Sequence, residues 1–232
     1  MHEISIKAEE LFNFLGIPVT NSLLLAVVVS IVLITFAIYL GRKIKLEPEG
    51  IQNFIEFILE KLLDLMDSVL GSRHLSEKYL PLIGTVFVFI LISNWFGLLP
   101  VVGSIGLVDE AHHSFIPIFR APSADLNFTI ALAIIGVLGV NLFGAMALGI
   151  KQHLSKFFTL KDPIFSFVGI LEFISEFIKI ISFSFRLFGN VFAGEVLLII
   201  VGFLVPYFVP LPFLFLELFV GFIQAFIFSM LT

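Results

Sequence analysis

The stretch FSFRLFGNVFAGE, residues Phe183 to Glu195, places a single arginine, Arg186, in the middle of a long apolar segment. An ionisable side chain at membrane depth costs at least about 3 kcal/mol on insertion scales, so such a residue is expected to have a function and a partner. Arg186 is therefore the residue that a prediction of function has to explain.

The composition of the 232-residue chain is typical of an integral membrane protein. Hydrophobic residues make up 59% of the chain and charged residues only 13%, a balance far from that of soluble domains. Thirty phenylalanines supply large apolar faces for lipid or for other membrane helices. The chain has no cysteine, which excludes disulfides, thiolate metal sites and thiol catalysis. Residues 1–16 lack the order of a signal peptide, so the first apolar run is expected to be a retained membrane helix.

The apolar runs predict an all-α polytopic membrane protein, built as one membrane domain over residues 1–232. A helix needs about 20 apolar residues to cross the hydrocarbon core of a bilayer, and five segments meet or exceed this length. The predicted elements are a first span at 22–40, an amphipathic surface helix at 49–70, a second span at 80–99, a third span at 126–148, a long tilted helix at 164–202 and a last helix at 213–232.

Segment 49–70 differs from the spans because charged residues alternate with apolar ones at helical spacing. Ile51, Ile55 and Ile58 recur on one side, while Glu56 and Glu60 fall between them. This pattern predicts an amphipathic helix that lies along the membrane surface. The alternative is an ordinary surface helix that packs on a soluble subunit.

The segment from Ile164 to Gly202 contains no proline, and as one helix it would be about 57 Å long, against about 30 Å of hydrocarbon. It is either one strongly tilted helix beside a protein partner or two spans that meet at Gly189 or Gly194. We favour one tilted helix, because its polar residues share a face along the whole length. The prolines expected to form the next turn are Pro206, Pro210 and Pro212.

Two shorter signals stand in the segment before the third span. Ser123 and Asp125 indicate a helix start, where hydroxyl and acidic groups meet free backbone N–H groups. The pair His112 and His113 is reminiscent of a metal site, but neighbouring side chains point apart and no third ligand is evident. We therefore expect no bound metal.

The distribution of cations predicts the orientation in the membrane. Only Lys7 and Arg120 lie on the side of the N-terminus. By the positive-inside rule, the N-terminus is outside and, after five crossings, the C-terminus is cytoplasmic. The cations of the opposite side are Arg42, Lys43, Lys45, Lys61, Arg73, Lys78, Lys151, Lys156 and Lys161.

Helical geometry gathers the polar residues of the long helix into a stripe. At about 100° per residue, four of them fall within about 40° of Arg186, whereas Glu195 falls on the opposite face and nearer the outside. The residues of this polar stripe, besides Arg186, are Glu172, Lys179, Ser182 and Asn190.

The partner of Arg186 has two candidates. The first is Glu217 on the last helix, in a structural ion pair within this chain. The second is a carboxylate on another subunit, to which an always protonated arginine offers a fixed counter-charge. We favour the second, because Glu195 and Glu217 lie further toward the outside and are expected to lie close together and share or relay a proton.

The roles of Gln224, Glu172 and Glu176 can each be interpreted in two ways. Gln224 shares a helical face with Glu217, and it either lines a water route or only hydrogen-bonds between helices. Glu172 and Glu176 lie near the inner surface, where they either line an inner access path or are interfacial carboxylates in contact with water.

Three motifs carry a resemblance to a known family. They are FRLFGN at 185–190 with AGE at 193–195, PSADLN at 122–127, and QAFIF at 224–228. Together they resemble subunit a of the F-type ATP synthase, the stationary membrane subunit beside the rotating c-ring, and the resemblance covers nearly the whole chain. Some bacterial members carry a histidine where this chain has Glu217.

The resemblance implies two offset half-channels that meet the c-ring on either side of Arg186. In the family, the arginine at this position faces the proton-carrying carboxylate of each c subunit, and polar residues line the access paths. The last two helices are then long and strongly tilted beside the ring. The residues assigned to the proton path are Asn190, Glu195, Glu217 and Gln224, with Glu172, Glu176, Asp125 and Ser182 as further members.

The resemblance also implies the partners and the compartment. We expect c-ring subunits, peripheral stalk b subunits and the lipid bilayer as partners, and no nucleic acid. No phosphate-cradling loop occurs, so we expect no nucleotide site and no cofactor in this chain. The transported ion is H⁺, with Na⁺ left open, and the membrane is the bacterial plasma membrane, with the thylakoid membrane as the alternative.

Two rival functions fit the sequence less well. A stand-alone proton-coupled secondary transporter also uses buried charges, but such folds usually show internal repeats or broken helices, which the sequence lacks. A passive assembly subunit does not account for the ionisable groups on the last two helices.

Overall fold

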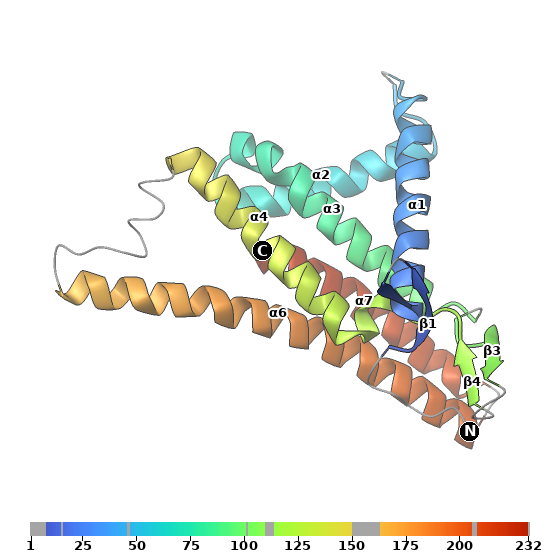
Figure 1. The fold of residues 1–232 in the computed structure, drawn as a ribbon. Coiled ribbons are helices and arrows are strands. Elements are labelled where there is room, and N and C mark those ends of the chain that lie inside the picture. The colour runs from blue at the N-terminus through green and yellow to red at the C-terminus, as the bar shows by residue number, and fades with distance from the viewer. Residues whose placement is uncertain are drawn as a thin grey trace.

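Helices dominate the computed structural model, which describes residues 8–14, 16–45, 47–100, 102–109, 114–149, 163–205 and 208–231 (Figure 1). Within these ranges five helices are long and apolar enough to cross a membrane, which confirms the predicted all-α polytopic fold. They are α1 (Asn21–Gly41), α3 (Arg73–Gly97), α4 (Leu126–Leu148), α6 (Pro163–Leu204) and α7 (Pro210–Leu231).

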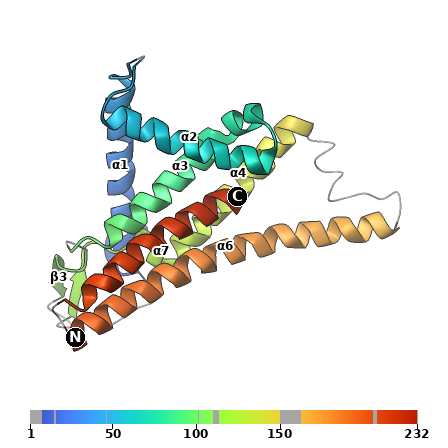
Figure 2. The same ribbon diagram turned by 180° about the vertical axis from the view of Figure 1, so that it is seen from behind.

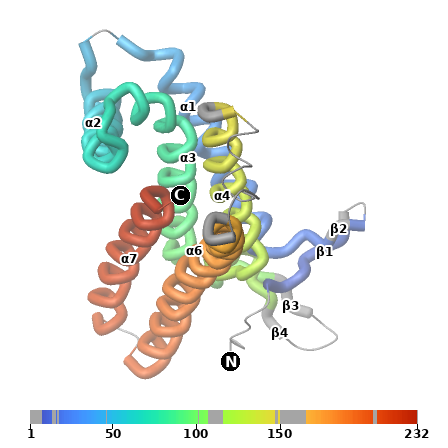
Figure 3. Tube along the Cα trace, turned by 90° about the vertical axis from the view of Figure 1, so that its left-hand side faces the viewer, coloured from blue at the N-terminus to red at the C-terminus, as the bar shows by residue number. Residues whose placement is uncertain are grey.

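The bundle is built around the contact of α3, α4, α6 and α7. Figure 3 shows α6 and α7 side by side, with α3 and α4 packed over them. Each of these four helices contributes apolar side chains to one core. Its buried members are Val86, Phe87, Ile90, Ala133, Val137, Phe183, Leu187, Ala225 and Phe228.

Helix α6 is one continuous helix of 42 residues, with no break at Gly189 or Gly194. At about 1.5 Å per residue it is about 63 Å long, roughly twice the hydrocarbon thickness of a bilayer. Figures 1 and 2 show α7 running beside the C-terminal half of α6, while the N-terminal half projects beyond the bundle. The favoured prediction of a single long helix therefore describes the structure, and the alternative of two spans does not.

The amphipathic helix α2 (Ile51–Leu70) packs on α3 through one face. Leu62 and Met66 are buried there, whereas Phe54 on another face is 65% exposed. Arg73, at the start of α3, donates to Asp67 at 2.9 Å, which ties the two helices together at the surface. The helix is present as predicted, and its position on a membrane surface stays a prediction.

Helices α3 and α7 begin three or more residues earlier than predicted, and both contain proline. Helix α3 begins at Arg73 rather than at residue 80 and accommodates Pro81 inside it, where Thr85 Oγ1 donates to the Pro81 carbonyl at 2.6 Å. Helix α7 begins at Pro210 and carries Pro212 in its first turn, where a missing N–H leaves no intrahelical bond unmade. The prediction that these two prolines form the turn is wrong, and Pro206 lies outside the described residues.

Two short hairpins were not predicted. They pair β1 (Glu10–Phe14) with β2 (Ile17–Thr20) and β3 (Gly106–Asp109) with β4 (Ser114–Pro117). Both lie at the end of the bundle where α4 begins and α6 ends (Figure 1). The amide of Asn21 donates to the Pro117 carbonyl at 3.3 Å and so joins the second hairpin to α1. Strands of four or five residues carry too little periodicity to be seen in the sequence.

Candidate functional site

Arg186 lies on α6 at its contact with α7. Its guanidinium donates to Ser182 Oγ at 3.4 Å, one turn earlier on the same helix, and lies 5.9 Å from the ring centre of Phe183. Within the described ranges, no carboxylate lies at ion-pair distance from Arg186. The internal ion pair with Glu217, one of the two candidates from sequence, is not formed.

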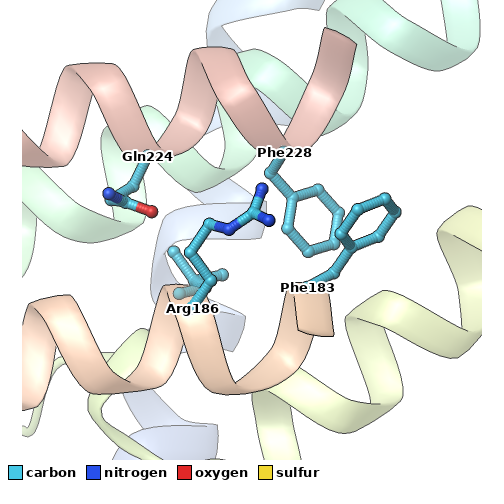
Figure 4. Close-up of a pocket in the computed structure, with 5 residues that line it drawn as sticks. Phe183, Arg186, Gln224 and Phe228 are labelled. Atoms are coloured by element: carbon cyan, nitrogen blue, oxygen red, sulfur yellow. The ribbon is translucent and has the colours of Figure 1, made fainter. Parts of the chain in front are cut away.

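A shallow pocket surrounds the guanidinium. Figure 4 shows Arg186 reaching from α6 toward α7, between Gln224 and the rings of Phe228 and Phe183. Gln224 is buried, so its amide belongs to the seam between the two helices. Asn190 is exposed on α6, and its side-chain amide donates to the Arg186 carbonyl at 2.9 Å.

Glu217 lies further along the same seam, and it depends on a glycine of α6 for its place. The side chain is 8% exposed. A Cβ on Gly194 would overlap the Glu217 carboxyl, so only a glycine leaves room for this carboxyl against α6. Glu217 and Gln224 therefore both point from α7 toward α6, as their spacing of seven residues predicted.

Glu195 has a partner that the sequence did not indicate. Its Oε2 lies 3.8 Å from Nε of Arg120, a residue that comes just before the start of α4. Arg120 is 7% exposed, and its guanidinium carbon lies 5.9 Å from the ring centre of Phe192 on α6. The carboxyl of Glu217 lies against Gly194, the residue before Glu195, but among the described residues no hydrogen bond joins the two carboxyls.

Asp125 has a structural place at the beginning of α4. Its Oδ1 accepts from the backbone N–H of Asn127 at 3.0 Å, which makes Asp125 the N-cap of the helix. Its Oδ2 accepts from the hydroxyl of Ser22 at 2.6 Å, so the same buried carboxylate joins α4 to α1. The predicted helix start is thus observed, and both carboxylate oxygens have partners.

Helix α7 is fixed in register against α3 by two side chains of α3. Asn94 donates to the carbonyl of Gly221 at 3.1 Å, and Trp95 donates to the carbonyl of Leu218 at 3.1 Å. A Cβ on Gly221 would lie 3.2 Å from the Asn94 Cβ, so the two helices are close at this point. These bonds hold α7 where Glu217 and Gln224 face α6.

In the N-terminal half of α6, Glu176 links α6 to α4. Its carboxylate accepts from the Asn141 amide at 3.2 Å and from Lys179 Nζ at 2.8 Å. Glu172 is half-buried one turn earlier. At about 1.5 Å per residue, Glu176 and Glu195 are about 28 Å apart along the helix, with Arg186 near the midpoint. The charged groups thus form two sets, one on each side of Arg186.

Metal binding finds no support in the part of the chain that is described: no group of three His, Cys, Asp or Glu side chains is arranged to hold an ion there. His112 and His113 lie outside the described residues.

The fold and these groups define a class: a polytopic α-helical membrane protein with ionisable side chains along a long helix and on the helix beside it. The family described as ATP synthase A chain matches residues 22–232. ATP synthase subunit a of Moorella thermoacetica is 31% identical over 229 residues, which are 98% of this chain and 94% of that protein. ATP synthase subunit a of Campylobacter fetus is 34% identical over 212 residues, 91% of this chain and 86% of that protein. The chain belongs to the ATP synthase subunit a family.

Proposed function

We propose that this chain is the proton-translocating stator subunit of an ATP synthase and that Arg186 separates two offset half-channels beside a c-ring. The observation that carries the proposal is that Arg186 has no carboxylate partner among the described residues. This fixed cation at the seam of α6 and α7 forms no ion pair within the described ranges, and acidic groups stand on α6 at both sides of it. A permanent charge without a carboxylate of its own is suited to a carboxylate that arrives with another subunit.

In the proposed path, a proton from outside passes Glu195, Glu217 and Gln224 and protonates a ring carboxylate. The neutral acid then moves through lipid with the ring. It releases the proton into an inner path near Glu172 and Glu176. Each charge that crosses 100 mV releases about 2.3 kcal/mol, so several must cross for each ATP made in other subunits.

Arg186 does two things in this path. It favours the ionised ring carboxylate, and it repels a proton that would cross directly from one half-channel to the other. Ser182 and Asn190, one turn away on either side, complete the polar surface toward the ring. Asp125 supports the outer path from its position at the start of α4.

The proposal includes the partners and the membrane. The c-ring lies against α6, the peripheral stalk b subunits bind the chain, and the bacterial plasma membrane holds it with the N-terminus outside and the C-terminus in the cytoplasm. The coupling ion is H⁺. Whether Na⁺ can replace H⁺ depends on the residues around the ring carboxylate, which belong to another chain.

ATP-driven acidification of vesicles that contain the assembled complex tests the proposal. Arg186→Ala is expected to abolish pumping, and Arg186→Lys to retain part of it because the charge remains. Co-purification of the ring with each variant is the control for assembly. Near-normal pumping by an assembled Arg186→Ala complex would refute the role of this residue.

A stand-alone secondary transporter is the alternative class. It predicts that the purified chain alone moves protons in vesicles and that no ring of small hairpin subunits accompanies it.

A further inference from the structure

We infer that Arg120 is the counter-charge of Glu195 and that it sets the pH at which the outer half-channel takes up a proton. This inference rests on the proposed function. It assigns to Arg120 a positioning role, which Arg120 exerts through Glu195.

The first support is the burial of Arg120. Arg120 is 7% exposed, and its Nε lies 3.8 Å from Oε2 of Glu195. A cation removed from water in this way needs compensation from a nearby anion. Glu195 supplies that anion, and the ring of Phe192, one turn earlier on α6, faces the same guanidinium. Phe192 and Glu195 of α6 thus both lie against the guanidinium of Arg120.

The second support is the geometry of the contact. At 3.8 Å the two atoms are within ion-pair distance but beyond hydrogen-bond distance. Within the described ranges, Glu195 Oε2 is buried and receives no hydrogen bond. The arginine therefore favours the ionised carboxylate through charge, while the oxygen keeps lone pairs for an arriving proton. A firmly hydrogen-bonded carboxylate would be less able to accept and pass on a proton.

The third support is the rigid attachment of Arg120. The next residue, Ala121, lies so close to α3 that a Cβ on Gly97 would come within 2.5 Å of its Cβ. Ser123 and Ala124 have no exposed surface, and Asp125 is bonded to Ser22. This short segment is enclosed between helices, so the guanidinium is held against α6 rather than carried on a loose loop.

The other charged groups on the elements packed against this part of α6 are few among the described residues. Glu217 of α7 has its carboxyl against Gly194. Asp125, beside the start of α4, has both oxygens occupied by Ser22 and the Asn127 N–H. Helix α4 contacts α6 through the neutral pair of Thr129 Oγ1 and Ser184 Oγ, which are 3.0 Å apart. Arg120 is therefore the one described cation at ion-pair distance from Glu195.

The test uses the complete complex in proteoliposomes, with ATP synthesis measured at a fixed membrane potential while the pH on the outer side is varied. Arg120→Gln is expected to raise the outer pH at which ATP synthesis is half-maximal by about one unit or more. The reason is that an opposite charge within about 4–6 Å typically changes the pKa of a carboxyl group by about one to three units. Arg120→Lys is expected to restore most of the wild-type profile. In a Glu195→Gln background, Arg120→Gln is expected to cause no further shift.

Two results would overturn the inference: an unchanged pH profile in Arg120→Gln, or an equal shift in the Glu195→Gln background. Should the Arg120→Gln complex not assemble, Glu195→Asp withdraws the carboxyl from Arg120 by one methylene and is expected to shift the profile in the same direction by less. An unchanged Glu195→Asp profile counts against the inference.

Arg186→Ala separates this inference from the proposed function. Loss of transport in that variant, together with an unchanged Arg120→Gln profile, overturns the role of Arg120 alone. Normal transport in Arg186→Ala overturns the proposed function itself.

Discussion

The two halves of α6 differ in what covers them. Beyond Arg186, the helix lies beside α7 and the segment before α4, which supply Glu217 and Arg120 to its surface. Before Arg186, the helix projects from the bundle, and large apolar side chains such as Phe167 (62%) and Ile178 (58%) are exposed. In the proposed orientation, these are the outer half and the inner half of α6.

Under the proposed function, this difference indicates which half-channel is enclosed by the chain's own helices. The carboxyls of the outer half have their surroundings fixed by the chain's own helices. In the inner half, Glu176 is bonded to Asn141 and Lys179, but much of the helix surface around it is open. We therefore propose that partners and lipid complete the inner half, and we expect substitutions there to have smaller effects within the chain itself.

The largest effect expected from this comparison is that of Glu217→Gln, in the outer half. It should lower coupled proton transport by about 100-fold, because positioned proton-transfer groups typically contribute 10²–10⁴-fold. ATP-driven acidification measures the change, with ring co-purification as the control. Transport close to wild type would remove Glu217 from the path.

Gly194→Ala is expected to have the next largest effect. The new Cβ would overlap the Glu217 carboxyl, so this carboxyl must move away from α6. Transport should fall by about tenfold, since a displacement of about 1 Å at a reacting group costs up to 10²-fold. Gly202→Ala is the matched control on the same helix, because a Cβ added at Gly202 would have no atom within 4 Å. Equal activity of the two variants would contradict the importance of the Glu217 position.

Glu176→Gln tests the inner half and should lower transport only by about threefold. The carboxylate is paired with Lys179, whose side chain is 51% exposed, and such exposed pairs contribute about 0–1 kcal/mol. Acidification rates measure the effect on transport, and the thermal midpoint of the purified complex measures the loss of the pair with Lys179. A loss as large as that of Glu217→Gln would show that the inner half is as completely built by this chain as the outer half.

Trp95→Phe should have the smallest effect, confined to stability. It removes the hydrogen bond to the Leu218 carbonyl, which is worth about 1 kcal/mol, and keeps most of the apolar ring surface. The thermal midpoint of the complex should fall slightly while the pH profile of transport stays the same. A changed pH profile would mean that Trp95 does more than hold α7 in place.

Much of the fold followed from local patterns in the sequence. The long apolar runs predicted the membrane helices, and an unbroken helical face predicted that α6 is continuous. The same periodicity predicted that Glu217 and Gln224 share one face of α7. Errors arose where the local signal was misleading, as at Pro210, because proline is equally at home in a turn and in the first turn of a helix.

The partners of the charged groups could not be predicted in the same way. Arg120 precedes Glu195 by 75 positions in the chain, and only the packing of the segment before α4 against α6 brings them together. In the sequence, Arg120 stood out only as a cation on the side predicted to face outward. A usable signal was present in its neighbours, because Arg120 stands between Phe119 and Ala121, two residue types that are often buried.

The position of Arg186 relative to the ring is the central claim, and disulfide cross-linking measures it most directly. The chain has no cysteine, so a single engineered one is unique. Asn190→Cys lies on the polar stripe one turn from Arg186, while Ile181→Cys is also exposed but about 140° away around the helix. With a second cysteine beside the ring carboxylate, a cross-link is predicted for Asn190→Cys and not for Ile181→Cys. A cross-link from Ile181→Cys alone, in complexes that retain the ring, would contradict the claim that Arg186 faces it.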